Sequence, residues 1–192
     1  MQFFTLNRLP FHLIEYPIFH TFIRSVYLVS SPPIISSATT IRRRLRDIIQ
    51  NKQHSTLKTL SPESKISIAL DCWISLYNQT FIAITGYFVN ANWVYQEILL
   101  GFKPLHSLYT GANLSAVLLE TLIYHNIQNR VFGITTDNTI NNKTLVDTIQ
   151  QILSSKTTVI RISCFVYIIQ LCLNQFLDCF KTVPQNDAAE TK

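Results

Sequence analysis

The chain has 192 residues, of which 47% are hydrophobic and 14% charged, so it can bury one substantial core and carry a small appendage. The four cysteines form no Cys-x-x-Cys pair, which argues against a zinc knuckle and a disulfide framework. Its apolar runs are interrupted by charges and prolines or fall short of the roughly 20 residues that a membrane-spanning helix needs, so we expect no membrane partner. The first residues lack a signal-peptide pattern, and we expect an intracellular protein.

Positive charge is concentrated at the front of the chain. Residues 1–60 hold eight Lys and Arg against Glu15 and Asp47, a net +6, whereas the remainder sums to −1. A basic segment beside a near-neutral body favours a polyanionic partner. We therefore divide the chain into a helical, basic N-terminal segment at 1–60, a core domain at 64–182 and a polar tail at 183–192.

The first thirty residues are aromatic and are interrupted by Pro10 and Pro17. Apolar residues between Leu13 and Ile23 recur at helical spacing, which predicts a short amphipathic helix. The sequence Ser-Ser-Pro-Pro at 30–33 then predicts a break in secondary structure.

A basic helix is predicted over residues 39–52, because Thr39 and Thr40 are a helix start signal before a periodic apolar run. Two interpretations fit its charges: a solvated basic face, or a helix that contacts the phosphates of DNA. The arginines concerned are Arg42, Arg43, Arg44 and Arg46.

From residue 64 the pattern becomes that of a sheet. Apolar residues alternate with polar or small ones over Ile66–Asp71, which predicts a strand. Two further strands, rich in β-branched and aromatic residues, are predicted over Phe81–Val89 and Trp93–Phe102. Short turns join all three, so we expect an antiparallel meander.

The second half of the chain alternates helices and strands. The resulting order, β-β-β-α-β-α-β-α, is the ribonuclease H-like arrangement, an α/β fold with a mixed sheet of strand order 3-2-1-4-5. Right-handed crossovers place the fourth strand beside the first and parallel to it. Helices are predicted over Gly111–His125, Asn141–Leu153 and Cys164–Phe180, and strands over Val131–Thr136 and Val159–Ile162.

Two predicted strands lead into an aspartate, Asp71 in one case and Asp137 in the other. Since neighbouring strands lie about 4.8 Å apart, both carboxylates should meet at the carboxyl edge of the sheet. Facing carboxylates suit Mg²⁺ or Mn²⁺, and paired ions can activate a water or a 3′-hydroxyl in phosphodiester transfer. The alternative is that Asp137 and Asn138 form a turn or helix cap and that Asp71 simply ends a strand.

A two-ion site normally needs a third carboxylate, and the candidates are poorly placed. Asp147 and Asp178 lie in predicted helices with no signal that they face the strand ends. Asp187 and Glu190 belong to the polar tail.

Several motifs in order along residues 9–175 carry a family resemblance. They are Leu70-Asp-Cys-Trp-Ile-Ser75, Phe81-Ile-Ala-Ile-Thr-Gly86, Leu105-His106 with Thr110-Gly-Ala-Asn-Leu114, Gly133-Ile-Thr-Thr-Asp-Asn138 with Asn141-Asn142, and Arg161-Ile-Ser-Cys164. Together with Glu-x-Pro-x-Phe at 15–19, they resemble the hAT family of DDE transposases, especially the BED-zinc-finger, ricesleeper-like proteins.

This resemblance implies that Asp71 and Asp137 are two members of an Asp-Asp-Glu triad that cuts and joins DNA in the nucleus. It also implies that the Glu, which follows a large helical insertion, and the BED finger are absent. The family's Cys-x-x-His reads Cys164-Phe-Val-Tyr167 here, which places a tyrosine where the family has a histidine. We therefore expect a truncated domain without independent transposition activity that retains some binding of DNA and a divalent ion.

Two alternatives remain at this point. One is a metal-dependent nuclease that recruits Asp147 or Asp178 as a third ligand. The other is a protein-interaction module, because the last helix carries more apolar surface than a small sheet covers and could bind a second copy or another protein.

Two other residues, Trp73 and His106, have two interpretations each. Trp73 could stack on a flipped base or pack at the core or its rim. His106 could contact DNA or a metal, or be an exposed loop residue. Tyr167 and the cysteines in apolar runs are expected to be packing residues, with the thiols buried and free.

Overall fold

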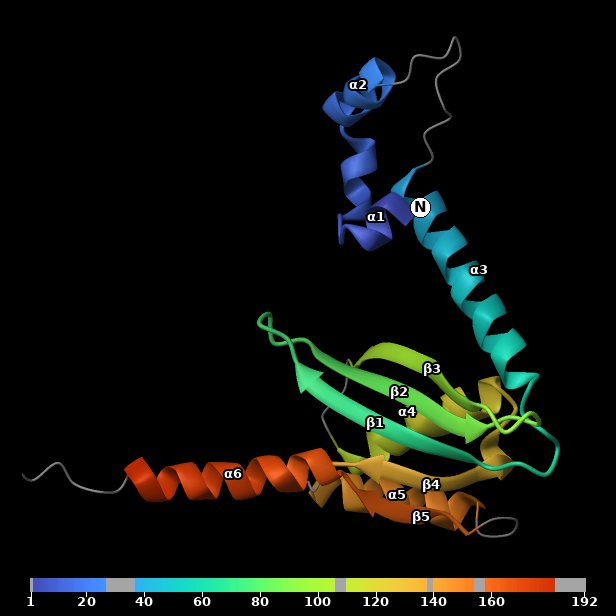
Figure 1. Ribbon diagram of the computed structural model, residues 1–192, viewed down its shortest axis with the longest axis vertical. Coiled ribbons are helices and arrows are strands. Elements are labelled where there is room, and N and C mark those ends of the chain that lie inside the picture. The colour runs from blue at the N-terminus through green and yellow to red at the C-terminus, as the bar shows by residue number, and fades with distance from the viewer. Residues whose placement is uncertain (1, 27–36, 106–109, 138–139, 154–157, 182–192) are drawn as a thin grey trace, which may run out of the picture. The chain divides into compact units, whose positions relative to one another are not determined.

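The computed structural model describes residues 2–26, 37–105, 110–137, 140–153 and 158–181 (Figure 1). The chain divides into two compact units, Met1–Leu57 and Lys58–Lys192. Among the helices in the described ranges, none combines the length and the apolar character needed to cross a membrane.

The first unit is helical and has a small core. Its elements are α1 (Gln2–Leu6), the 3₁₀ helix η1 (Phe11–Glu15), α2 (Pro17–Val26) and α3 (Ala38–Leu57). Phe4, Ile14, Ala38 and Ile41 are buried together, and Leu9, Phe11, Leu13 and Phe19 pack against them.

The single helix predicted between Leu13 and Ile23 is wrong, because the chain forms η1 and α2 with Tyr16 between them in an extended conformation. Tyr16 precedes a proline, which disfavours the helical conformation at that residue. Pro17 then begins α2, where its fixed φ and missing N–H cost nothing. The break predicted at 30–33 lies outside the described residues.

The second unit contains a five-stranded sheet of order β3-β2-β1-β4-β5, as predicted. The pairs β1–β2 and β2–β3 are antiparallel, and the pairs β1–β4 and β4–β5 are parallel, which confirms the ribonuclease H-like arrangement. The strands are β1 (Ile66–Ile74), β2 (Thr80–Val89), β3 (Tyr95–Leu105), β4 (Val131–Thr136) and β5 (Ile160–Ser163).

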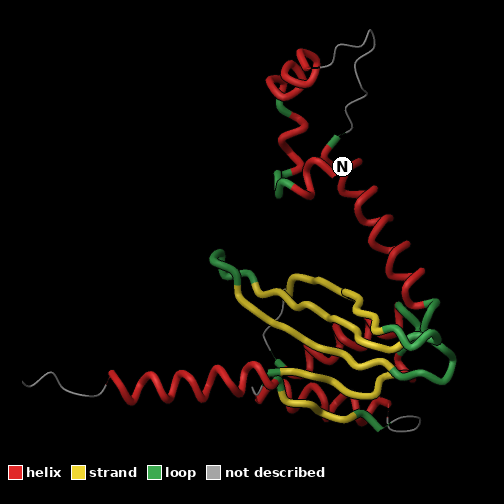
Figure 2. Tube along the Cα trace, viewed as in Figure 1, coloured by secondary structure: helices red, strands yellow, loops and turns green. Residues whose placement is uncertain are grey.

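Two helices cover one face of this sheet (Figures 1 and 2). They are α4 (Gly111–Tyr124) and α5 (Ile140–Leu153), with a 3₁₀ turn η2 (Gln128–Arg130) before β4. Each fully buried Ile or Leu between the sheet and these helices contributes about 1.5–3 kcal/mol to the free energy of folding. The large aliphatic side chains that are fully buried are Ile66, Ile68, Ile82, Ile84, Leu114, Leu118, Leu122, Val131, Ile134, Leu145 and Ile149.

Side chains alternate across β1, so Ser67, Ala69, Asp71 and Trp73 face the side opposite to the buried Ile66, Ile68 and Leu70. This is the face turned toward the viewer in Figure 1, and no described helix of the second unit lies across it there. The sequence pattern therefore separates a packed face from a face that holds the candidate site.

The last helix, α6 (Phe165–Lys181), starts one residue after β5 and extends away from the edge of the sheet (Figure 1). Cys172 and Cys179 of α6 are exposed, and Cys72 and Cys164 are partly exposed. The expectation of buried thiols is therefore wrong. An apolar run predicts burial only when another element covers the helix, and no described element covers α6.

Candidate carboxylate site

Asp71 lies inside β1 and not at its end, because the strand continues for three more residues to Ile74. In the ladder, Asp71 is opposite Ala83, and the pairing continues through Trp73 with Phe81 and Ile74 with Thr80. The Asp71 side chain is exposed on the uncovered face. The buried Leu70 next to it holds the strand against the core.

Asp137 follows directly after β4 and is half-buried. The preceding residue, Thr136, is 1% exposed, and its Oγ1 donates to the carbonyl oxygen of Asp137 at 3.0 Å. The carbonyl oxygen of Thr136 accepts from the backbone N of Cys164 at 2.9 Å. Thr136 thus ties the end of β4 to the start of α6 and fixes the backbone that carries Asp137.

The two aspartates line one hollow with a volume of about 490 Å³. The structure therefore brings together the two residues that the sequence analysis placed at neighbouring strands. The rest of the wall comes from β1, β2, the end of β4 and the first turns of α6. It consists of Ala69, Leu70, Cys72, Ala83, Thr85, Tyr87, Thr135, Thr136, Cys164, Val166, Tyr167 and Gln170.

No third acidic residue contributes to this wall within the described part of the chain. Asp147 on α5 and Asp178 on α6 are both exposed and do not line the hollow. In the ranges that the structure describes, no group of three His, Cys, Asp or Glu side chains could hold a metal ion. Asp187 and Glu190 lie outside those ranges, as do the predicted site residues Asn138 and His106.

Sequence reasoning missed Gln170 as a lining residue. Gln170 follows Tyr167 by three residues, so both lie on the same side of α6 and both line the hollow. A polar residue within an apolar helix was the available signal. Cys72 is a second missed residue, and nothing in its sequence context distinguishes it from an ordinary strand residue.

Tyr87 also lines the hollow. It pairs with Ser67 near the start of β1, whereas Trp73 lies near the end of that strand. Burial raises the pKa of its phenol, and the nearby charges of Glu97 and Tyr95 raise it further. The Tyr87 and Tyr95 rings are stacked with centroids 6.2 Å apart. This end of the wall therefore presents the neutral phenol of Tyr87 at neutral pH.

Trp73 is 39% exposed and belongs to a cluster of three aromatic rings on the uncovered face of the sheet. Its ring centroid lies 6.0 Å from that of Phe81 and 5.6 Å from that of Phe102. Trp73 is thus partly exposed on the same face of β1 as Asp71, two residues along the strand.

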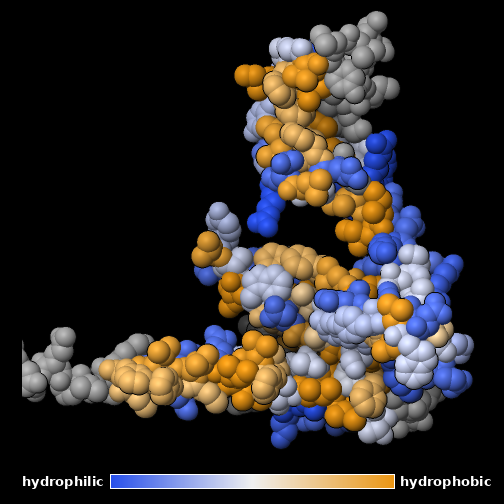
Figure 3. All heavy atoms as spheres, in the orientation of Figure 1, coloured by the Kyte–Doolittle hydropathy of each residue, from blue (hydrophilic) through white to orange (hydrophobic). Residues whose placement is uncertain are grey.

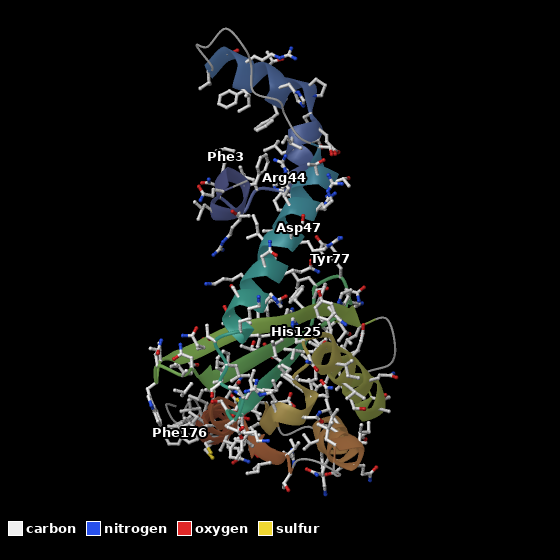
Figure 4. All side chains as sticks on the ribbon, turned by 90° about the vertical axis from the view of Figure 1, so that its right-hand side faces the viewer. Phe3, Arg44, Asp47, Tyr77, His125 and Phe176 are labelled. Atoms are coloured by element: carbon white, nitrogen blue, oxygen red, sulfur yellow. The ribbon has the colours of Figure 1, made fainter. Side chains whose placement is uncertain are left out.

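The basic helix α3 belongs to the first unit and is described by itself. It runs over Ala38–Leu57, longer than the predicted 39–52, and all four candidate arginines on it are exposed. Figure 4 labels Arg44 on this helix together with Asp47, the helix's single acidic residue. None of the four arginines forms an ion pair with another described residue.

Comparisons with known proteins identify several relatives. The chain is 45% identical over 195 residues to the putative transcriptional regulator tpeD of Talaromyces stipitatus, with 99% of this chain aligned. It is 25% identical over 143 residues to a putative AC transposase of Zea mays, covering 73% of this chain. It is 23% identical over 135 residues to the BED zinc-finger protein RICESLEEPER 1 of Oryza sativa, covering 69%.

The aligned region is a small part of these relatives: it spans 23% of the tpeD protein, 17% of the AC transposase and 18% of RICESLEEPER 1. Among solved structures, the HTLV-2 integrase catalytic core domain in complex with magnesium aligns with 65% of this chain and 78% of that chain, at a TM-score of 0.32 and 13% identity.

The protein family described as the ZBED1 RNase-like domain matches residues 69–164 of this chain. This stretch includes both aspartates and ends at Cys164. This match covers half of the chain, and the resemblance to hAT transposases that the motifs predicted is confirmed by the AC and RICESLEEPER relatives. The chain is therefore a hAT-transposase-derived, ribonuclease H-like domain and belongs to the ZBED1 RNase-like family.

Proposed function

We propose that this chain is a DNA-binding domain derived from a hAT transposase, that it has no independent transposition activity, and that it keeps a single weak divalent-cation site at Asp71 and Asp137. One observation carries the proposal: the hollow contains two carboxylates and no third acidic residue among the described residues that line it. Transposition by the family's chemistry needs paired ions held by three carboxylates, and two carboxylates balance the charge of only one ion.

The donor set fits one hard cation. Mg²⁺ is usually held by one or two carboxylates together with several waters, and Mn²⁺ accepts the same oxygen ligands. Asp71 and Asp137 would hold the ion, and the exposure of Asp71 leaves room for its water shell. When bound, such an ion would supply positive charge for a phosphate group. The residues of the wall add oxygen and amide groups from Thr135 and Gln170.

Calorimetric titration with Mn²⁺ tests the cation site in the wild-type chain and in Asp71→Asn and Asp137→Asn. We expect saturable binding in the wild type that is lost in both variants. Asp147→Asn is the matched control, because it removes an exposed carboxylate that does not line the hollow. Absence of binding at millimolar Mn²⁺, or binding that survives both site substitutions, would show that the two aspartates are not a cation site.

The absence of transposition activity is tested separately with DNA hairpin-formation and strand-transfer assays. We expect no product from the wild-type chain with Mg²⁺ or Mn²⁺. Hairpin or strand-transfer products that disappear in Asp71→Asn would overturn this part of the proposal. The metal-dependent nuclease left open by the sequence needs Asp147 or Asp178 as a ligand, and neither lines the hollow.

DNA binding is assigned to α3 and, with it, a nuclear location. Support comes from the exposed arginines on this helix and from the relatives, one described as a putative transcriptional regulator and others as transposases. A regulator that binds DNA needs no strand cleavage, which agrees with an incomplete carboxylate set. The salt dependence of DNA binding, compared between the wild type and a variant without these arginines, is the decisive measurement.

A further inference from the structure

Helix α3 contributes only its first turn to the core of the first unit. Ala38 and Ile41 belong to that core, whereas in the described range 42–57 Thr56 is the single buried residue of the helix. At 1.5 Å per residue, this remaining part of α3 is about 24 Å long. Figure 3 shows hydrophilic residues in blue along it. Most of α3 therefore does not serve the packing of the unit to which it belongs.

Four polar side chains lie in one row along α3. Successive members are four, three and four residues apart, and at about 100° per residue this spacing keeps them within about 60° of one another around the helix axis. All four are exposed. We name them the α3 row, and its members are Thr39, Arg43, Arg46 and Gln50. The row thus offers a hydroxyl, two guanidinium groups and an amide, and no carboxylate.

Two further arginines lie on opposite sides of the α3 row. Around the helix axis, Arg42 is about 70° from the middle of the row in one direction, and Arg44 is about 130° from it in the other. Asp47, the single acidic residue of α3, lies on the Arg44 side and outside the row. A helix in the major groove of DNA has a phosphate backbone on each side, and flanking arginines meet those phosphates. The middle of such a helix faces the bases.

The dimensions of the α3 row fit the major groove. A helix with its side chains is about 10–12 Å across, and the groove is about 12 Å wide. The row is about 16 Å long from Thr39 to Gln50. Because base pairs are stacked about every 3.4 Å, it spans about four to five of them.

We propose that α3 enters the major groove and that the α3 row reads base edges there, so that this chain selects duplex DNA by sequence. The inference rests on the proposed binding of DNA by α3 and adds a second kind of contact to it. Arginine pairs with O6 and N7 of guanine, glutamine pairs with N6 and N7 of adenine, and the methyl group of threonine packs on that of thymine. Each bidentate pair discriminates against a wrong base by about 5- to 150-fold. Gln50 carries no charge for a phosphate, whereas adenine recognition uses its amide.

Reading of bases changes the salt dependence of binding in a way that phosphate contacts alone do not. On a duplex of random sequence, all four arginines of α3 neutralise phosphates. On a preferred sequence, Arg43 and Arg46 contact bases instead, so the slope of log K against log salt concentration is smaller in magnitude by about 2, at about 0.9 per arginine. The preferred sequence therefore binds more tightly and with a weaker salt dependence.

Selection from a library of random duplexes with the full chain, followed by fluorescence anisotropy on the selected and a random duplex, tests this inference. We expect an enriched motif of about four to five base pairs that contains guanine and binds at least about 10-fold more tightly than random sequence. Gln50→Ala, and Arg46→Lys, which keeps the charge but loses the bidentate fork, should each lower this preference by about 5-fold or more. Asn51→Ala is the matched control, because it removes an exposed amide outside the row, and it should leave the preference unchanged.

The outcomes separate this inference from the proposed function on which it rests. Duplex binding without an enriched motif, or with equal salt slopes on both duplexes, would overturn the reading of bases and leave DNA binding by α3 intact. Absence of any duplex binding would overturn both. A preference that survives Gln50→Ala and Arg46→Lys, or that Asn51→Ala removes equally, would show that the α3 row does not read the sequence. Far-UV circular dichroism verifies that each variant keeps its helices.

Discussion

Gly86 shows how a single residue without a side chain permits the packing of the sheet against its helices. A Cβ at this position would lie 2.8 Å from Ile66 Cδ1 and 3.0 Å from Leu100 Cδ1. Ile66 is fully buried and Leu100 is 4% exposed, so neither side chain has free space to move into. Crowding by these side chains is therefore the reason that glycine fits at this position. Backbone conformation is not the reason, because φ is not positive there.

We predict that Gly86→Ala lowers the free energy of unfolding by about 1–3 kcal/mol, the usual cost of overpacking a core. Urea denaturation followed by tryptophan fluorescence measures the change. Gly101→Ala is the milder comparison, because its added Cβ would approach Thr121 only to 3.3 Å, and it should cost less than Gly86→Ala. Equal stability of Gly86→Ala and the wild type would show that Ile66 and Leu100 relax at little cost.

At this scale the sequence predicted that Asp71 and Asp137 lie on neighbouring strands, and both line one hollow, whereas their role as a cation site stays a prediction. The alternation of residues in β1 predicted that Asp71 and Leu70 face opposite sides of the sheet. The right-handed connection between parallel strands predicted that β4, which leads into Asp137, lies next to β1. The end of β1 was predicted too early, because the pairing of Trp73 and Ile74 depends on Phe81 and Thr80 across the turn. Such cross-strand pairing is not encoded in the periodicity of one strand.

Among the elements, α3 is held by a side chain from a distant segment. Glu15 Oε1 accepts a hydrogen bond from the backbone N of Ala38, the first residue of α3, at 3.1 Å. A carboxylate at this end satisfies an otherwise unpaired N–H and complements the positive end of the helix dipole. The Glu-x-Pro-x-Phe segment therefore has a structural reason: Glu15 caps α3, Pro17 begins α2 and Phe19 packs on the core.

We predict that Glu15→Ala weakens the first turn of α3 by about 1 kcal/mol, so that exchange of the Ala38 amide becomes roughly fivefold faster. Hydrogen exchange followed by NMR measures this effect at the residue concerned. Asp47→Ala removes the same charge from within α3 and should leave Ala38 exchange unchanged. A similar acceleration in both variants would mean that net charge, and not the cap, protects the amide.

Element order and type were largely predictable because the apolar period changes clearly from two to about 3.6 along the chain. The exposure of α6 was predictable only in part. Its composition indicated surplus apolar surface, but the free thiols Cys172 and Cys179 were expected to be buried. Burial depends on which elements meet in space, and periodicity within one helix carries no information about its neighbours.

At the scale of the whole molecule, the two units differ in charge: Met1–Leu57 holds seven Lys and Arg against two acidic residues, a net +5, and Lys58–Lys192 holds nine against nine, a net of zero. This difference supports the proposal that attraction to DNA belongs to the first unit. Each phosphate that an arginine neutralises releases a counterion, and log K then falls with log salt concentration by about 0.9 per contact. The number of arginines engaged is therefore measurable without knowing the DNA sequence that is bound.

We predict that the full chain binds duplex DNA and that log K falls as log salt concentration rises. The magnitude of this slope should decrease by about 3–4 when all four arginines of α3 are replaced by glutamine, since each contributes about 0.9. Fluorescence anisotropy across a salt series measures both slopes. Lys143→Gln with Arg161→Gln removes two exposed cations of the second unit and should change the slope little. If the α3 variant kept the wild-type slope, the arginines would be a solvated face, and DNA attraction would have to arise elsewhere in the chain. The substituted residues are Arg42, Arg43, Arg44 and Arg46.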